Sequence, residues 1–327
     1  MSNQNQAFVL GTDGNLWYET GDWKNISDTI QNRLQVDGNV NQVFSQVGGN
    51  RIWRPAFQPL NTNEIFVLGS DGNLWYETGD WKNISDTIQN RLQVDGNVYQ
   101  FWALDSNTIF VLGTDGNLWY ETGDWKNISD TIQNRLQVDG NVLSFQVMDS
   151  QTLFVLGTDG NLWFETGPWG NVLAVIERRQ QVDGNVSEFW AVDNGTVFVQ
   201  GSDLNLWLET SNGQWDISNT IEFRTPVDAN VNGLQPVDSN TIFVLGHDGN
   251  LWLETGPFEG VSQTVATRKP VETNVITFEA LYPSLEVYLI DGDLNLWYEY
   301  PPYGPSNRLL VDSNVNACFP LYSYPSI

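Results

Sequence analysis

An internal repeat of about 44 residues constrains the fold of this chain more than any other feature of its sequence. Residues 110–142 are identical to residues 8–40, and they differ from residues 66–98 only at Thr114, where the middle copy has Ser70. Later copies diverge but keep Asn-Leu-Trp, whose tryptophans are Trp17, Trp75, Trp119, Trp163, Trp207, Trp252 and Trp297. The intervals between these tryptophans are 58, 44, 44, 44, 45 and 45 residues. A fixed period in this range indicates a repeat architecture, here with seven units.

Each unit predicts four short strands separated by turns. In the first unit, strands at residues 6–10 and 16–19 flank a turn that contains Asp13-Gly14, a pair that favours a tight hairpin. A loop follows, in which Ser27 is expected to cap a single helical turn, and residues 33–37 form the next strand. The remaining strand is clearest in the third unit, at residues 99–104. Four antiparallel strands repeated seven times predict a β-propeller, and the lack of polar capping units argues against a solenoid.

The phase of the repeat at the two chain ends predicts a closed ring. The chain begins with the second strand of a unit and ends, at residues 316–320, with a first strand that lacks its partners. Pairing this strand with the N-terminal strands would complete one blade and would remove an exposed sheet edge. We therefore predict an all-β, single-domain, seven-bladed propeller over residues 1–327, with four antiparallel strands per blade. The expected blades are 315–327 with 1–39, then 40–97, 98–141, 142–185, 186–230, 231–274 and 275–314.

One insertion breaks the regular spacing. Residues 41–54 lengthen the interval that precedes Trp75, and they carry two arginines, Arg51 and Arg54, outside the repeated arginine position. A surface loop beside the second blade is the simplest expectation, and a functional element that occurs only once is the alternative.

The composition disfavours several classes of partner. The chain has 14 basic and 40 acidic residues, a formal net charge of −26, so nucleic acid and anionic membrane surfaces are poor candidates. Cys318 is the only cysteine, which excludes an intrachain disulfide. The sequence shows neither a signal peptide nor an apolar run long enough for membrane insertion. We expect a cytoplasmic protein or one released by a non-classical route, and the sequence leaves its oligomeric state open.

A polar stripe recurs on the hairpin after the Asp-Gly turn. Pairing Glu19 with Arg33 sets Trp17 against Gln35 and Asn15 against Asp37, so these residues share one face. The stripe has two interpretations: packing between blades with compensated charges, or a sugar site where an indole stacks and charged groups bind hydroxyls. Its candidate carbohydrate-binding residues are Glu19, Arg33, Glu77, Arg91, Glu121, Arg135, Glu165 and Arg179.

The loop after the tryptophan strand supplies a second set of candidates. One position of this loop is aromatic in every unit, as Trp23, Trp81, Trp125, Trp169, Trp215, Phe258 and Tyr303. Each ring could serve as a plug that holds the loop on its blade, or as a stacking platform for a sugar.

The sequence predicts no catalytic, metal or cofactor site. The two oxygens of an Asp-Gly turn fall far short of a calcium shell, and His247 has no histidine partner. The acidic residues recur in every unit, and no asymmetric acid–base pair is visible. We therefore expect a protein that is not an enzyme.

In its organisation, the chain resembles the β-propeller lectins of bacteria and fungi. The resemblance lies in its near-identical, tryptophan-rich 44-residue units; the Gly-His and Trp-Asp marks of WD40 units are missing. It implies multivalent binding of glycans or glycoconjugates in grooves between blades, where repetition on one ring raises avidity. The alternative is a protein–protein interaction scaffold, for which an acidic ring favours a basic partner.

Overall fold

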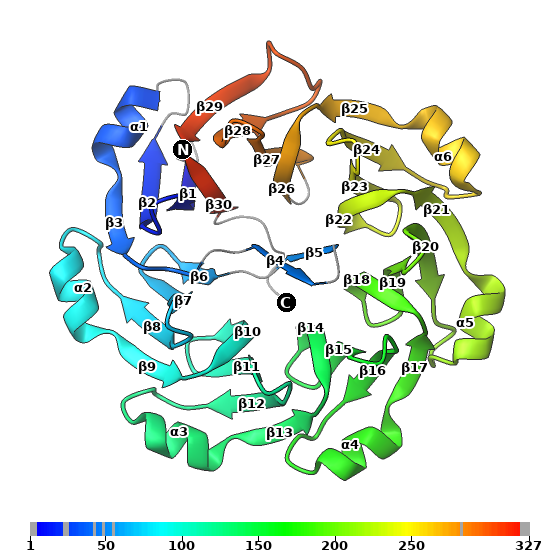
Figure 1. Cartoon of the computed structure of the whole chain (residues 1–327), viewed down its shortest axis with the longest axis horizontal. Helices are drawn as coiled ribbons and strands as arrows, with labels where there is room; N and C mark the ends of the chain where they lie inside the picture. Colours follow the sequence, from blue (N-terminus) through cyan, green and yellow to red (C-terminus); the bar gives the residue numbers. More distant parts are fainter. Residues whose placement is uncertain are drawn as a thin grey trace.

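Seven four-stranded antiparallel sheets form a closed ring (Figure 1). A computed structural model describes residues 5–21, 26–41, 44–47, 50–53, 56–281 and 284–320. The sheets are the blades of a propeller, with one strand of each blade near the axis and one at the rim. The predicted all-β, seven-bladed architecture with four strands per blade is confirmed.

The blades follow the sequence repeat. From the innermost to the outermost strand, the first four blades are β30 (Val315–Pro320), β1 (Asn5–Gly11), β2 (Leu16–Gly21), β3 (Leu34–Asp37); β6 (Phe57–Asn61), β7 (Glu64–Leu68), β8 (Leu74–Thr78), β9 (Leu92–Asp95); β10 (Val98–Asp105), β11 (Thr108–Gly113), β12 (Leu118–Thr122), β13 (Leu136–Asp139); and β14 (Val142–Asp149), β15 (Thr152–Gly157), β16 (Leu162–Thr166), β17 (Gln180–Asp183). In the same order, the last three are β18 (Val186–Asp193), β19 (Thr196–Gly201), β20 (Asn205–Thr210), β21 (Thr225–Ala229); β22 (Val231–Asp238), β23 (Thr241–Gly246), β24 (Leu251–Thr255), β25 (Lys269–Glu272); and β26 (Val275–Leu281), β27 (Glu286–Asp291), β28 (Asn295–Glu299), β29 (Arg308–Ser313).

The two ends of the chain close the ring, as predicted. Strand β30 pairs antiparallel with β1, setting Val9 opposite Cys318 and Phe8 opposite Phe319. The N-terminal segment supplies the other three strands of this blade. Cys318 is buried in the same core cluster as Val9. The ladder between β1 and β30 pairs the edges that an open ring would leave exposed.

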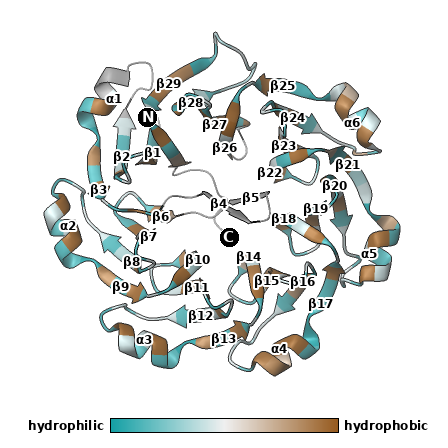
Figure 2. Ribbon diagram, in the orientation of Figure 1, coloured by the Kyte–Doolittle hydropathy of each residue, from teal (hydrophilic) through white to brown (hydrophobic). Residues whose placement is uncertain are grey.

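A short helix lies at the rim in six blades, between the third and the outermost strand (Figures 1 and 2). These helices are α1 (Ile26–Asn32), α2 (Ile84–Asn90), α3 (Ile128–Asn134), α4 (Val172–Arg178), α5 (Ile217–Phe223) and α6 (Val261–Thr267). Asn127 caps α3, its side chain accepting a hydrogen bond from the backbone of Ser129. Ser27 lies within α1, so the expectation that it caps one helical turn is wrong. Each helix packs on the outermost strand of the preceding blade, as α3 does on β9, and thus bridges two blades.

The core lies between the faces of neighbouring blades. In β11, Ile109, Phe110, Val111 and Leu112 are all fully buried, although alternate residues of a strand point to opposite faces. Both faces of the sheet are therefore covered, which explains why the second strand of each unit is continuously apolar rather than alternating.

The register of the tryptophan hairpin was predicted in part. Trp17 pairs with Gln35, as expected, but Asp37 lies opposite Leu16, so the pairing of Asn15 with Asp37 is wrong. A β-bulge between Leu16 and Trp17 inserts one extra residue on the outermost strand and shifts the register. The pairing of glutamate with arginine occurs within the ladder in the seventh blade, between Glu299 and Arg308. Arg33 immediately precedes β3.

The insertion forms a hairpin near the axis of the ring. Strands β4 (Phe44–Val47) and β5 (Asn50–Trp53) pair antiparallel, and Figure 1 shows them across the central opening. Strand β5 approaches β18 and β22, the innermost strands of the fifth and sixth blades. The expected position beside the second blade is therefore wrong, because the inserted chain crosses to the opposite side of the ring.

Candidate functional site

A tryptophan and an arginine stack on one another in every blade. The guanidinium carbon of Arg135 lies 3.9 Å from the centre of the Trp119 ring, and the longest of the seven distances is 4.4 Å, between Arg308 and Trp297. The other pairs are Arg33 with Trp17, Arg91 with Trp75, Arg179 with Trp163, Arg224 with Trp207 and Arg268 with Trp252. Such contacts are attractive because the cation faces the negative side of the aromatic quadrupole.

Each of these arginines also joins its blade to the preceding one. Arg135 Nη1 donates to Asp95 Oδ2 at 3.1 Å, and the same nitrogen lies 3.7 Å from Glu121 Oε1 in its own blade. The acids that the other arginines contact across the blade boundary are Asp312 for Arg33, Asp37 for Arg91, Asp139 for Arg179, Asp183 for Arg224, Asp228 for Arg268 and Glu272 for Arg308. The junction between the first and seventh blades therefore uses the same chemistry as the other six.

The glutamate of the stripe is buried beneath the stack. Glu121 is fully buried, and neither of its oxygens accepts a hydrogen bond from the described part of the chain. Burial, followed by the charge of Asp95, raises the pKa of Glu121 to about 9, although Arg135 opposes this shift. At neutral pH this shift favours the protonated carboxyl, which can donate a hydrogen bond to Asp95. One arginine then balances one aspartate at the junction.

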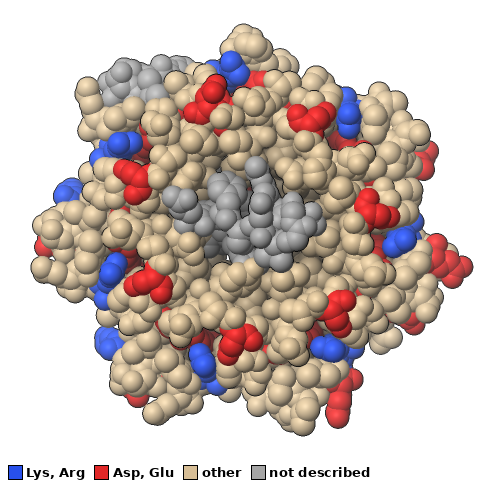
Figure 3. All heavy atoms as spheres, in the orientation of Figure 1, with Lys and Arg blue, Asp and Glu red and all other residues tan. Residues whose placement is uncertain are grey.

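The outer part of each guanidinium faces solvent. The Arg135 side chain retains 23% of its exposure, and its Nε and Nη2 groups donate to nothing in the described residues. Trp119 and Gln137, which pair across the strands β12 and β13, are partly exposed beside it. Figure 3 shows basic side chains at intervals around one face of the ring, each close to an acidic side chain. We refer to the partly exposed surface around each tryptophan–arginine stack as the blade groove.

The loop aromatic residues that the structure describes take no part in these grooves. Trp125 is 2% exposed, and its ring meets Phe66 of the preceding blade edge-on at 6.1 Å. Its Nε1 donates to the carbonyl of Ser106 in its own blade at 2.6 Å. Trp81, Trp169, Trp215 and Phe258 are buried in the same way, and Tyr303 is partly buried with its hydroxyl donating to Leu285. Of the two interpretations, this geometry favours the plug. Trp23 lies outside the described residues.

The arginines and glutamates predicted as candidates are brought together by the fold. Glu19 with Arg33, Glu77 with Arg91, Glu121 with Arg135 and Glu165 with Arg179 lie within 4.0 Å of one another. Sequence reasoning missed the partner across the blade boundary, such as Asp95 for Arg135, because it paired the aspartate within its own hairpin. An acidic residue follows the valine of each outermost strand, and this recurrence was the signal that could have indicated the partner across the boundary.

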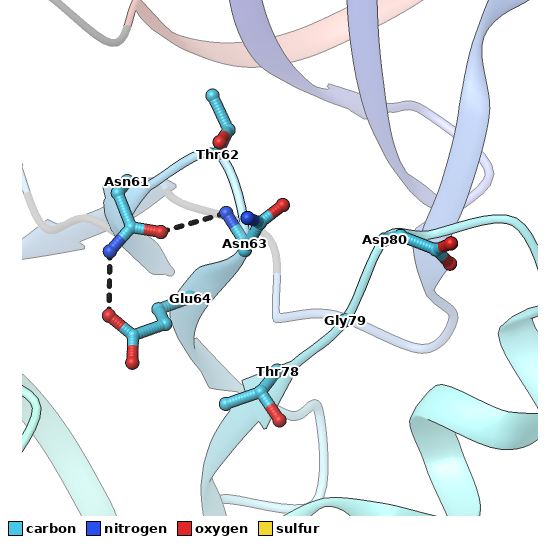
Figure 4. Close-up of a pocket in the computed structure, with 7 residues that line it drawn as sticks. All are labelled: Asn61, Thr62, Asn63, Glu64, Thr78, Gly79 and Asp80. Atoms are coloured by element: carbon cyan, nitrogen blue, oxygen red, sulfur yellow. Dashed lines mark hydrogen bonds between the residues drawn. The ribbon is translucent and has the colours of Figure 1, made fainter.

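An open depression on the second blade offers little to a ligand. It has a volume of about 690 Å³ and is lined by Asn61, Thr62, Asn63, Glu64, Thr78, Gly79 and Asp80 (Figure 4). Asn61 Nδ2 donates to Glu64 Oε2 at 2.6 Å, and Tyr76 donates to the other oxygen of Glu64 at 2.7 Å. The polar groups that line the depression are thus largely bonded to protein atoms.

Two further features bear on possible ligands. Within the described ranges, no group of three or more histidine, cysteine, aspartate or glutamate side chains is placed to hold a metal ion. No helix in the same part of the chain is long and apolar enough to cross a membrane.

Comparison with known proteins identifies the fold and no family. No family model matches the chain, and no curated protein matches it. Among solved structures, YCF48 from Cyanidioschyzon merolae aligns with a TM-score of 0.52 at 11% identity, over 92% of this chain and 97% of that one. The WD40 β-propeller domain of Doa1 aligns with a TM-score of 0.47 at 13% identity, over 75% and 78% of the two chains.

PorZ, a surface component of the type-IX secretion system of Porphyromonas gingivalis, aligns with a TM-score of 0.49 at 11% identity. The match covers 82% of this chain and spans about a third (33%) of the PorZ chain. Similarity at such low identity concerns the fold alone.

Proposed function

We propose that this protein is a multivalent carbohydrate-binding protein and that its sites are the blade grooves. The observation that carries this proposal is the repeated stack of Arg135 on Trp119. One amino group of the arginine is anchored to Asp95, while Nε and Nη2 remain available to a ligand. Donors held in one geometry beside a partly exposed indole suit the hydroxyl oxygens and C–H surface of a sugar.

The arrangement changes the manner of binding that the sequence suggested. Arg135 covers one face of the Trp119 indole, so a sugar ring cannot stack there and would contact the guanidinium and the indole edge. The burial of Glu121 excludes it from direct contact with a ligand. Asp95 holds the arginine through a hydrogen bond, and Glu121 lies beneath it at 3.7 Å.

Repetition would strengthen binding by individually weak sites. A single shallow site binds a sugar weakly, whereas several identical sites on a rigid ring raise avidity through effective concentration. A binding role is also favoured over catalysis, because the acidic groups recur in the same arrangement around the ring. An acid–base catalyst also needs groups within hydrogen-bond reach of its substrate, and Glu121 and Asp95 are both buried.

A glycan array with the full-length chain tests this proposal. A triple variant with Arg91→Lys, Arg135→Lys and Arg179→Lys keeps the charges but loses the planar donors. We expect its apparent affinity on the array to fall at least tenfold, because the number of competent grooves decreases. Arg178→Lys, on the exposed surface of α4 beside Arg179, is the matched control and should leave binding unchanged. A folded protein that binds no glycan, or a triple variant that binds normally, would contradict the proposal.

A second candidate function, a protein-interaction scaffold, is favoured by the apolar residues exposed on the rim helices. One helix position carries Ile30, Ile88, Ile132, Ile176, Ile221 and Val265, each about 40% exposed (between 38% and 45%). The fourth and fifth blades add Leu173 at 69% and Phe223 at 66%. Leu173 of α4 stands where α3 has Ser129, and Phe223 of α5 stands where α3 has Asn134. These two large apolar side chains therefore occur in two neighbouring blades.

Restoring the residues of the repeat tests the scaffold function. The double variant Leu173→Ser and Phe223→Asn removes the apolar side chains and leaves the blade grooves intact. If the rim binds a protein partner, affinity pull-down with this variant should lose a partner that the unmodified chain retains, while glycan binding persists. A basic partner is expected, since the chain carries a net charge of −26.

A further inference from the structure

We infer that the seven blade grooves are of two kinds and that four contiguous grooves, those of Trp17, Trp75, Trp119 and Trp163, bind a neutral, hydroxyl-rich ligand. This inference rests on the proposed function and specifies its valency and ligand class. In these four grooves the tryptophan pairs across the strands with a glutamine, namely Gln35, Gln93, Gln137 and Gln181. The other three grooves have Pro226, Pro270 and Leu310 at that position, none of which carries a polar side-chain group.

The glutamine is held in one orientation by the hairpin turn. Gln137 Nε2 donates to Asn117 Oδ1 at 3.1 Å, and Asn117 Nδ2 donates to Asp115 Oδ2 at 2.8 Å. The same chain of bonds joins Gln35 to Asn15, Gln93 to Asn73 and Gln181 to Asn161, at 3.0 Å each. Because its amino group is committed in this way, the Gln137 amide presents Oε1 as an acceptor, and no described residue donates to it.

A neighbouring glycine accompanies the glutamine in each of the four grooves. Gly140 follows the junction aspartate, and a Cβ atom at that position would lie 3.2 Å from Asn117 Oδ1 and 3.8 Å from Gln137 Nε2. Gly38, Gly96 and Gly184 occupy the same position in the other three grooves with glutamine. The grooves without glutamine have Ala229, Thr273 and Ser313 there. Space for the amide network is thus kept only where the glutamine is present. The glutamine position and the glycine position therefore divide the seven grooves into the same groups of four and three.

The paired donor and acceptor define the ligand class. Arg135 offers donors and Gln137 offers an acceptor on the same small surface, and a hydroxyl group can satisfy both because it donates and accepts. A carboxylate can only accept, so it would leave the glutamine oxygen without a partner. The Arg135 charge is already balanced by Asp95, and the exposed carboxylate of Asp115 lies at the end of the amide network. An anionic sugar is therefore disfavoured relative to a neutral one.

The seventh groove differs in a second respect. Trp297 Nε1 donates to Asp291 Oδ2 at 2.8 Å, so its indole N–H is committed to the protein. Its arginine, Arg308, contacts Glu272 at 2.6 Å in place of the aspartate used elsewhere. Both changes satisfy the polar groups of this groove internally, which agrees with its assignment to the group that lacks glutamine.

The number of sugars bound at saturation tests the inference. Equilibrium dialysis of the full chain would use radiolabelled methyl glycosides of neutral hexoses, with methyl glucuronide as the anionic probe. We expect four neutral sugars per chain and weaker binding of the glucuronide. Gln137→Leu should lower the number to three, whereas Gln263→Leu on the exposed surface of α6 should leave it at four. The double variant Pro226→Gln and Ala229→Gly should raise it to five.

The possible outcomes separate this inference from the function on which it rests. Seven sugars bound per chain would overturn the division into two kinds of groove, and the lectin function would still stand. The same conclusion would follow if Gln137→Leu and the double variant both left the number of bound sugars unchanged. Preferential binding of the glucuronide would overturn the ligand class. A folded chain that binds none of these probes would refute the proposed function and this inference with it.

Discussion

Replacing the buried Glu121 with glutamine should stabilise the protein. The pKa of this carboxyl rises from 4.5 in the unfolded chain to about 9 in the native state. Between these values the native state holds a proton that the unfolded state releases, so stability is fully present below pH 4.5 and decreases as pH rises toward 9. At about 1.4 kcal/mol per pH unit, the cost at pH 7 is about 3 kcal/mol. An amide avoids this cost because it is neutral at every pH and can donate to Asp95.

Urea unfolding at pH 5, 7 and 9 measures this effect. Relative to the unmodified chain, Glu121→Gln should change the free energy of unfolding by less than about 1 kcal/mol at pH 5 and raise it by about 3 kcal/mol at pH 7. The gain should increase further at pH 9. Glu177→Gln, on the exposed face of α4, is the matched control and should leave the free energy of unfolding nearly unchanged. A Glu121→Gln variant that is destabilised at pH 7 would refute the reasoning, because it would mean that Glu121 is ionised and paired with Arg135.

Two further substitutions test the junctions between blades. Asp312→Ala removes the partner of Arg33 where the first and seventh blades meet, and it should lower the free energy of unfolding by about 1–3 kcal/mol in urea. Lys82→Ala, which removes an exposed ion pair, should leave the free energy of unfolding nearly unchanged, and equal losses in the two variants would contradict this distinction. Trp125→Phe keeps a ring in the junction but loses the bond to Ser106, so calorimetry should show a lower Tm with glycan binding unchanged. A loss of glycan binding without a change in Tm would instead assign Trp125 to a binding site.

The fold could be predicted because the repeat carries long-range information within one chain. Seven copies of four strands limit the architecture, and the phase of the chain ends indicates which strands pair. The position of the insertion could not be predicted in this way. Residues 41–54 occur once, so no other copy shows which surface the β4–β5 hairpin meets, and its approach to β18 and β22 depends on the closed ring.

The site could be predicted only in its composition. Alternation along β12 and β13 correctly grouped Trp119, Glu121 and Arg135 on one face. Partners across the blade boundary were missed, since the sequence order gives the ladder within a hairpin but not the twist that brings two blades together. The bulge beside Trp119 moves Asp139 out of the expected register, and this aspartate then contacts Arg179 of the next blade.

The same head-to-tail junction explains how such a ring tolerates nearly identical units. Each blade presents an acid to the blade that follows it and an arginine on a tryptophan to the blade that precedes it, as Asp95 and Arg91 do in the second blade. Every copy therefore complements every other copy, and duplicating a unit creates no unpaired buried charge. A heterologous interface of this kind would extend indefinitely unless its rotation closes. Because Arg33 meets Asp312 at 3.1 Å, close to the distances at the other junctions, the rotation per blade closes at seven.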